Sequence, residues 1–344
     1  MRGLILKTAA ISVLGVSLVS AQETQSLVKN ENPNVKLAGI RSSYYGFRDE
    51  NGKQHFPTPD EAAIVMQNIA AKFDATPSAV WIIGGIRQAK RDSKGKIVKD
   101  AYCHLEFEAP EGGTKDKNIT FAKTDKHTEY LNKFDEIGAK VYLQVEPGMA
   151  SAEELIRLVL DKYGHHKSVI GFGIDVEWYP SNGHNDKTGD IGTNYEGNET
   201  DKPIDTKNLA KLEKIVKSYN PDFKLFIKHF DPKYLGGKPV GDVVYINDSF
   251  GFPEGIEQFS DEFAEFANIF SPNNVAYQIG YAGWMKEYDK KEDVTWWSKL
   301  EDPMIEMSNA VYRKIKNKNQ VADVYWVDFT ITWKQFEDLW KQDK

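Results

Sequence analysis

Two carboxylic acids stand one residue apart at the end of an apolar run. Residues 169–178 read VIGFGIDVEW, and Asp175 and Glu177 close this strand-like segment. Because side chains alternate along a strand, both acids are expected on the same face. Two carboxyls held together do not both ionise freely, so one keeps a proton near neutral pH beside an anion. Such a pair can protonate a glycosidic oxygen. The alternative is structural, with both acids bonded to arginines or loop amides.

Other polar and aromatic residues stand near the ends of further strand-like runs. Glu146, in QVEPG, is a third candidate catalytic acid. Carboxylates and amides bind sugar hydroxyls, and aromatic faces stack on sugars, although each aromatic side chain is equally explained by packing. A substrate-binding role is predicted for Arg41, Tyr44, Asp231, Tyr245, Asn247, Asp248, Gln278, Tyr281, Trp326 and Asp328. Additional candidate platforms are Tyr45, Trp81, Trp284, Trp296 and Trp297.

A repeating arrangement of strands must bring these residues together. Nearly continuous apolar runs, typical of parallel strands covered on both faces, occupy residues 35–42, 78–86, 139–146, 168–178, 223–230, 242–250, 274–282 and 322–330. Helix-like segments lie between them, over residues 59–73, 125–138, 206–219, 256–270, 303–316 and 333–344, with a further helix opening at Ser151.

This alternation predicts an α/β fold, a single (β/α)8 TIM barrel over residues 36–344. Residues 87–125 and 181–203 are interpreted as loop insertions, the second directly after the strand that carries the two acids. Barrel enzymes place their catalytic groups at the carboxyl ends of the strands, which is where Asp175 and Glu177 would lie. An open doubly wound sheet is the alternative architecture.

The acid pair resembles part of the motif of the family 18 glycoside hydrolases, the chitinase group. That family carries DxxDxDxE at the end of its fourth strand, and this chain reads IGFGIDVE. The resemblance would make Glu177 the general acid and Asp175 the group that orients the substrate's acetamido oxygen. It would also place Trp326 under a sugar and Asp248 in the sixth-strand motif.

The same comparison shows departures from the family. Ile170 and Gly173 replace the first two acids of the motif, and Asn247 stands where the sixth strand of the family has Tyr. A second enzyme reading therefore pairs Glu146 with Glu177 in a retaining or inverting glycosidase. A third is a chitinase-like barrel that binds a glycan without turnover. Exposure of Glu177 would favour an enzyme, whereas a buried and ion-paired Glu177 would count against one.

Composition and the N-terminal sequence limit these functional alternatives. The net charge is -7 with acids and bases interleaved, which argues against nucleic acid or an anionic membrane as partner and favours an oligosaccharide or polysaccharide. Residues 1–21 resemble a signal peptide ending at Ala21, so we expect secretion, followed by a loose lead-in over 22–35. Cys103 stands alone and is expected to be buried. No metal or cofactor motif is present, and a monomer is expected.

Overall fold

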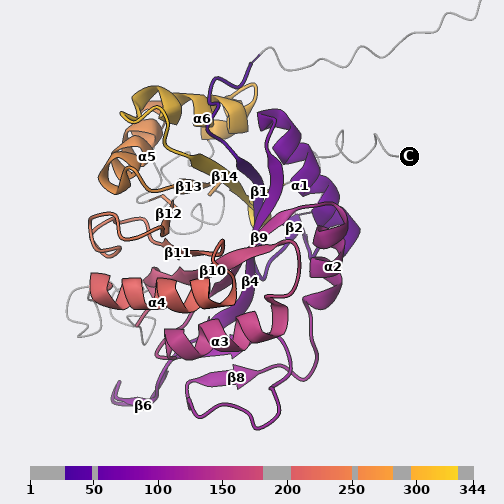
Figure 1. Cartoon of the computed structure of the whole chain (residues 1–344), viewed down its shortest axis with the longest axis vertical. Coiled ribbons are helices and arrows are strands. Elements are labelled where there is room, and N and C mark those ends of the chain that lie inside the picture. Colours follow the sequence, from indigo (N-terminus) through magenta and orange to yellow (C-terminus); the bar gives the residue numbers. More distant parts are fainter. Residues whose placement is uncertain (1–27, 49–52, 181–202, 250–254, 282–295, 332–344) are drawn as a thin grey trace, which may run out of the picture.

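The computed structural model describes residues 28–48, 53–180, 203–249, 255–281 and 296–331 (Figure 1). Within these ranges eight parallel strands form a closed barrel, because β1 pairs with both β14 and β4. The strands are β1 (Leu37–Arg41), β4 (Thr76–Arg87), β9 (Lys140–Val145), β10 (Val169–Asp175), β11 (Lys224–Lys228), β12 (Val244–Asn247), β13 (Val275–Ile279) and β14 (Ala322–Val327). The predicted TIM barrel is confirmed, and the open sheet is excluded by the closure.

Helices surround the barrel between successive strands, except between β11 and β12, where the described chain forms turns (Figure 1). They are α1 (Pro59–Phe73), α2 (Thr128–Glu136), α3 (Ala152–Tyr163), α4 (Thr206–Tyr219), α5 (Ile256–Phe270) and α6 (Pro303–Lys314). The Thr58 side chain accepts from the Glu61 amide and completes a capping box, which explains the start of α1. The helix expected over 333–344 lies outside the described residues. None of the helices in the described ranges is long and apolar enough to cross a membrane.

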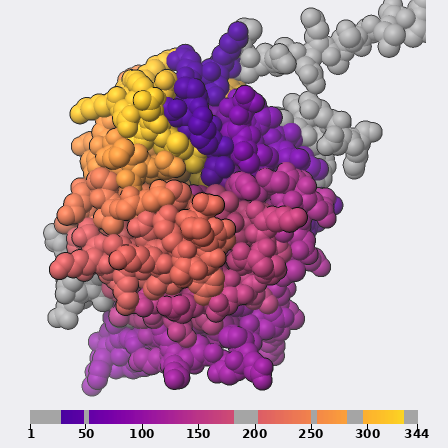
Figure 2. All heavy atoms as spheres, viewed as in Figure 1, coloured from indigo at the N-terminus to yellow at the C-terminus, as the bar shows by residue number. Residues whose placement is uncertain are grey.

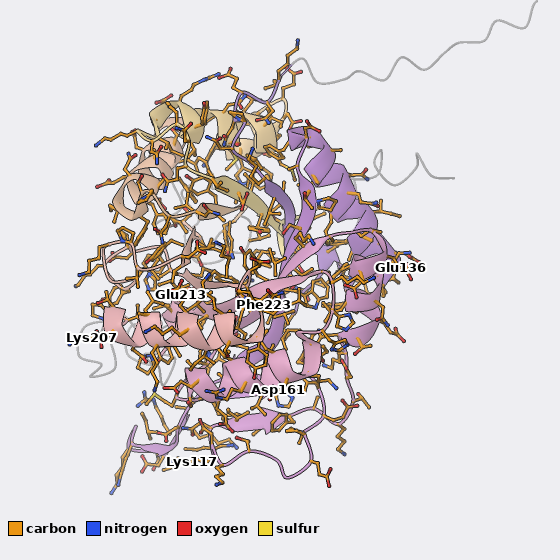
Figure 3. All side chains as sticks on the ribbon, viewed as in Figure 1. Lys117, Glu136, Asp161, Lys207, Glu213 and Phe223 are labelled. Carbon is orange, nitrogen blue, oxygen red and sulfur yellow. The ribbon has the colours of Figure 1, made fainter. Side chains whose placement is uncertain are left out.

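Two apolar cores hold the barrel. The larger one lies between strands and helices, and the smaller one fills the barrel interior with Val80, Tyr142, Phe226, Val244, Ile246, Ala276 and Tyr325. The helices keep their charged faces outward, as Figure 3 shows for Glu136, Asp161 and Lys207, whereas Phe223 is buried. Along each barrel strand, residues therefore alternate between the interior and the helix layer.

The first insertion extends one barrel strand beyond its neighbours. Beyond Gly84, β4 pairs antiparallel with β7 (Tyr102–Leu105), which in turn pairs with β8 (Ile119–Phe121). Cys103 lies on β7 and is fully buried, as expected. A separate hairpin is formed by β5 (Lys90–Arg91) and β6 (Ile97–Lys99), and a short ribbon by β2 (Phe47–Arg48) and β3 (Gln54–His55). The second insertion lies outside the described residues up to 202.

The described part of the lead-in is not loose. The Glu31 amide donates to Asn309 Oδ1 over 2.7 Å, and Asn32 Nδ2 donates to Ser308 Oγ over 3.3 Å. Arg313 on α6 also pairs with Glu31. In Figure 2 this indigo segment accordingly lies against the yellow C-terminal part of the body. Polarity suggested a mobile segment, but these polar side chains attach it to α6.

Candidate active site at the carboxyl end of the barrel

The interior of the barrel changes from apolar to polar towards the carboxyl ends of the strands. On four strands, an apolar interior residue is followed two positions later by a polar one: Tyr142 by Gln144, Phe226 by Lys228, Ile246 by Asp248 and Ala276 by Gln278. The alternation of strand side chains requires both members of each pair to face inward. The carboxyl end of the barrel, here called the mouth, is therefore lined with polar groups.

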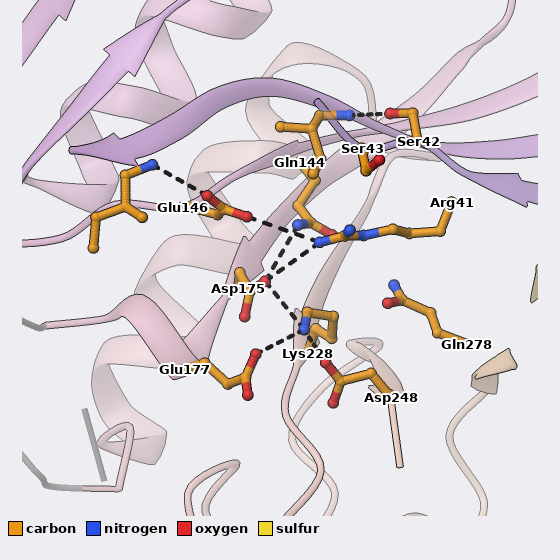
Figure 4. A network of polar contacts seen from close by, with 12 residues as sticks. Arg41, Ser42, Ser43, Gln144, Glu146, Asp175, Glu177, Lys228, Asp248 and Gln278 are labelled. Atoms are coloured by element: carbon orange, nitrogen blue, oxygen red, sulfur yellow. Dashed lines mark hydrogen bonds and ion pairs between the residues drawn. The ribbon is translucent and has the colours of Figure 1, made fainter. Parts of the chain in front are cut away.

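Lys228 connects three of the carboxyl groups in the mouth (Figure 4). Its Nζ lies 3.1 Å from Asp175 Oδ2 and 3.1 Å from Glu177 Oε2, and it also bonds to Asp248 Oδ2. Burial alone would lower the pKa of Lys228, but the charges of Asp175, Asp248 and Glu177 raise it well above its ordinary value. The ammonium therefore stays protonated, which makes Lys228 unsuitable as an amine nucleophile.

Arg41 connects the remaining carboxyl group to the same cluster. Its Nη2 lies 3.8 Å from Glu146 Oε1 and 4.0 Å from Asp175 Oδ2. Gln144 Nε2 donates to Asp175 Oδ2 over 3.4 Å, and the Ile86 amide donates to Glu146 Oε2 over 3.1 Å. Arg41 and Lys228 thus face four carboxyl groups, so two negative charges would remain if all four ionised.

Burial keeps protons on this cluster. It raises the pKa of Glu146 above its ordinary value, and the charge of Glu177 raises it further, against Arg41 and the Ile86 amide. Burial also raises the pKa of Asp175 and of Asp248, against the ammonium of Lys228. The mouth therefore holds carboxyls whose protonated form is favoured by burial, beside the two cations Arg41 and Lys228, and this arrangement suits a general acid next to an anion.

Two of the four acids are accessible. The side chains of Glu177 and Glu146 are 24% and 13% exposed, whereas those of Asp175 and Asp248 are 1% and 7% exposed. A Glu177 that is both buried and ion-paired would count against an enzyme. Glu177 is ion-paired, but it is not buried, so only one of these two conditions is met. Asp175 and Asp248 form the floor, and the two glutamates lie above it.

The local backbone at Glu177 differs from the expected strand. β10 ends at Asp175, and residues Val176–Trp178 form a 3-10 turn. Both acids nevertheless reach the same ammonium, so their carboxylate oxygens are separated by no more than twice 3.1 Å. The two side chains are directed to one site, although strand alternation is not the reason.

Several buried polar atoms of the mouth have no hydrogen-bond partner in the protein. They are Arg41 Nε, Gln144 Oε1, Asp175 Oδ1, Asp248 Oδ1, Gln278 Nε2 and Asp328 Oδ1. The other Gln278 atom, Oε1, accepts from the Tyr281 hydroxyl over 3.0 Å. Unpaired buried polar groups are costly, so the polar floor of the mouth is not fully satisfied by the described part of the protein.

Aromatic side chains lie beside this polar floor. Tyr45 and Tyr281 both pack edge-on against Phe329, with ring centroids 6.1 and 5.7 Å apart. Tyr44 and Tyr45 are 40% and 56% exposed. The Tyr44 hydroxyl lies over Gly85, where an added Cβ would stand only 2.1 Å from it. These rings are placed to stack on an apolar sugar face.

Three predicted binding residues lie outside the mouth, which corrects their roles. Tyr245 stacks on Phe270 at 3.9 Å, and Asn247 donates to Glu262 Oε1 over 3.4 Å, so both face α5. They alternate with Asp248 on the strand and must point away from it. Trp326 is 2% exposed, packs on Trp297 and donates to Thr330, so it cannot form the floor of a subsite.

Of the remaining predicted residues, one lies beside the mouth and the others have structural contacts elsewhere or lie outside the described residues. Asp328 Oδ2 accepts from the Ser43 amide over 2.7 Å beside the mouth, and burial raises its pKa to about 6. Asp231 accepts from the Lys233 amide in the turn after β11, which gives it a local structural role. Trp81 is buried and donates to His127, so it packs rather than stacks. Trp296 packs against Phe259, and Trp284 lies outside the described residues.

The departures from the family 18 motif have a steric reason. A Cβ at Gly173 would lie 1.9 Å from the Phe226 ring, so the space for an acid is filled. Ile170 packs against the apolar core of the barrel interior. The motif acids are therefore absent because the barrel interior is packed differently, and not because of an isolated substitution.

Sequence reasoning missed Lys228 and Gln144. The signal was present, because each stands two residues after a bulky interior residue on a strand with otherwise apolar neighbours. Among the described residues, no group of three or more His, Cys, Asp or Glu side chains is arranged to hold a metal ion.

Comparison with known proteins gives structural matches only. No protein-family model and no curated protein matches this chain. It is similar to β-glucuronidase 3 of Bacteroides uniformis at 11% identity, with a TM-score of 0.42 over 87% of this chain and 34% of that one. It is also similar to an endo-β-mannanase/endo-β-glucanase of Prevotella bryantii at 9% identity, with a TM-score of 0.39 over 86% of this chain and 45% of that one.

A third match is a psychrophilic family 10 endo-β-1,4-xylanase, at 9% identity and a TM-score of 0.37, covering 86% of both chains. The chain spans about a third of the length of the β-glucuronidase. These proteins are glycoside hydrolases, but similarity at this level carries no argument for activity. An argument for activity must come from the residues of the mouth.

Proposed function

We propose that this chain is a glycoside hydrolase acting on a polysaccharide, with Glu146 and Glu177 as its catalytic pair. The observation that carries the proposal is the opposite environment of the two accessible carboxyls in the mouth. Burial raises the pKa of Glu146, whereas Glu177 lies 3.1 Å from a buried ammonium. Burial favours the protonated form of Glu146, whereas Lys228 gives Glu177 a cationic partner.

In this mechanism Glu146 donates its proton to the glycosidic oxygen as the bond to the leaving sugar breaks. Glu177, which contacts the ammonium of Lys228, either attacks the anomeric carbon or removes a proton from the attacking water. The resemblance to family 18 gave Glu177 the role of general acid. Here Glu146 takes that role, because Glu177 contacts the ammonium of Lys228. A substrate-assisted step is not part of the proposal, because Asp175 is only 1% exposed and is bonded to Lys228 and Gln144.

The substrate is bound by the accessible groups of the mouth. The carboxyls of Glu146 and Glu177, which are 13% and 24% exposed, suit sugar hydroxyls, and Tyr44 and Tyr45 supply exposed rings. No metal or cofactor enters the mechanism. Secretion after cleavage at Ala21 and a monomeric state remain predictions, because residues 1–27 lie outside the described ranges.

The test is product release from a panel of neutral and acidic polysaccharides by the chain from Gln22 onward. We expect one glycan to be cleaved, with losses of about a thousandfold in Glu146→Gln and Glu177→Gln. Glu129→Gln, an exposed carboxyl on α2, is the matched control and should keep full activity. Silence across the panel, with one glycan still bound by all four proteins, would refute catalysis and support the chitinase-like binding reading.

A further inference from the structure

The first insertion carries a charge opposite to that of the whole chain. Residues 87–99, here called the basic hairpin, read RQAKRDSKGKIVK and contain six Lys or Arg and one Asp, in a chain of net charge -7. Lys90, Lys94, Lys96 and Lys99 are exposed. In the figure β6 lies at the lower edge of the molecule, beyond α3 (Figure 1).

The hairpin presents these cations at a cost to its own stability. Lys90 and Lys99 are directly opposite each other across the β5–β6 ladder, and like charges in that position destabilise a hairpin. The one acid, Asp92, is used by the turn, where Oδ1 accepts from the amides of Lys94 and Lys96 over 2.9 Å each. Folding alone does not require this charge pattern, so an anionic ligand would explain it.

The basic hairpin is continuous with the mouth. The guanidinium of Arg87, at its base, lies 5.9 Å from the centroid of the Tyr44 ring. The Tyr44 hydroxyl also lies over Gly85, and the amide of the next residue, Ile86, donates to Glu146. A chain bound in the mouth beside Tyr44 would therefore extend towards Arg87 at the base of the hairpin.

We propose that the basic hairpin binds carboxylate or sulfate groups of an acidic polysaccharide, whose neutral sugars occupy the mouth. Four carboxyls line the mouth, so they repel a polymer charged at every residue, such as nucleic acid. A glycan in which acidic and neutral sugars alternate matches both regions. The inference that an acidic polysaccharide is the substrate rests on the proposed function. The binding of an acidic polysaccharide to the basic hairpin does not rest on it.

The test measures binding to immobilised hyaluronan, keratan sulfate, dextran and double-stranded DNA. The hairpin variant is Lys90→Ser/Lys94→Ser/Lys96→Ser, which spares Lys99 over the Tyr102 ring and Arg91, whose Nη1 donates to Gly95. The control Lys167→Ser/Lys214→Ser/Lys316→Ser makes the same charge change at exposed lysines elsewhere. All proteins carry Glu177→Gln, so turnover does not disturb the measurement.

We expect hyaluronan or keratan sulfate, in which neutral and charged sugars alternate, to bind and dextran not to bind. The hairpin variant should bind about tenfold more weakly, and the control variant about as well as the parent, in low salt. Binding of keratan sulfate alone would identify sulfate as the recognised group. Equal loss in both variants, no loss in either, or equally tight binding to DNA would overturn the proposal. Because binding is read without catalysis, an inactive enzyme would refute the proposed function and leave this result standing.

Discussion

Replacing Lys228 with Met removes the ammonium that Asp175, Glu177 and Asp248 share. That ammonium lies 3.1 Å from oxygens of the first two, on a side chain that is 1% exposed. Removing one partner of a buried ion pair costs about 3–5 kcal/mol, because the other charge is left without compensation. We expect the free energy of unfolding to fall by about this amount at slightly alkaline pH.

The loss should shrink in acid. Without the ammonium, burial raises the folded-state pKa values of Asp175 and Asp248 further above their unfolded values near ~4. A carboxyl with a raised folded pKa supports the fold fully below its unfolded pKa, and this support is lost as the pH rises through the folded pKa. At a pH of about 4 the floor carboxyls of the variant are protonated, and the deficit should fall to about 1 kcal/mol.

Urea denaturation at several pH values between about 4 and 8 measures both effects. Lys224→Met on the same strand is the control, because Lys224 pairs with Asp242 at a site where the two side chains are 30% and 52% exposed. The control should lose no more than about 1 kcal/mol, with little change above pH ~5. A Lys228→Met deficit that is as small as the control, or that is the same at every pH, would refute the account of the cluster.

Other consequences concern packing, buried charge and capping. Gly173→Ala should lower the free energy of unfolding by about 2 kcal/mol in urea titrations, because its Cβ would meet the Phe226 ring, and an unchanged midpoint would contradict this packing. Burial raises the pKa of Asp323 to about 7, so wild-type stability should fall as the pH rises from ~4 to ~7. Asp323→Asn should reduce this slope by up to about 4 kcal/mol, and an unchanged slope would assign all of it to other groups. Thr58→Ala should lower the thermal midpoint through a loss of about 1 kcal/mol, whereas no shift would show that its cap on α1 is dispensable.

The barrel was predictable because its strands have a distinctive sequence pattern. Covered parallel strands are continuous apolar runs, and the helical patterns between them predicted α1 to α6. A helix after every strand was also expected, but turns rather than a helix join β11 to β12. The boundary at Glu177 was not, since the 3-10 turn that follows Asp175 depends on tertiary contacts.

The site was only partly predictable, and one rule explains both the success and the error. Strand alternation, applied from Asp248, would have excluded Tyr245 and Asn247 from the mouth. The same rule, applied from the bulky Phe226, would have brought in Lys228. A lysine on an apolar strand is easily assigned to a solvated end, and only the closed barrel shows that three acids surround it.

The most direct test of the catalytic assignment compares substrates that need an acid with substrates that do not. The wild type, Glu146→Gln and Glu177→Gln would be assayed on the cleaved polysaccharide and on an aryl glycoside of the same sugar, whose phenolate leaves without protonation. The account predicts that Glu146→Gln loses activity on the polysaccharide but largely keeps it on the aryl glycoside, whereas Glu177→Gln loses both. The reverse pattern would contradict the assignment and make Glu177 the acid.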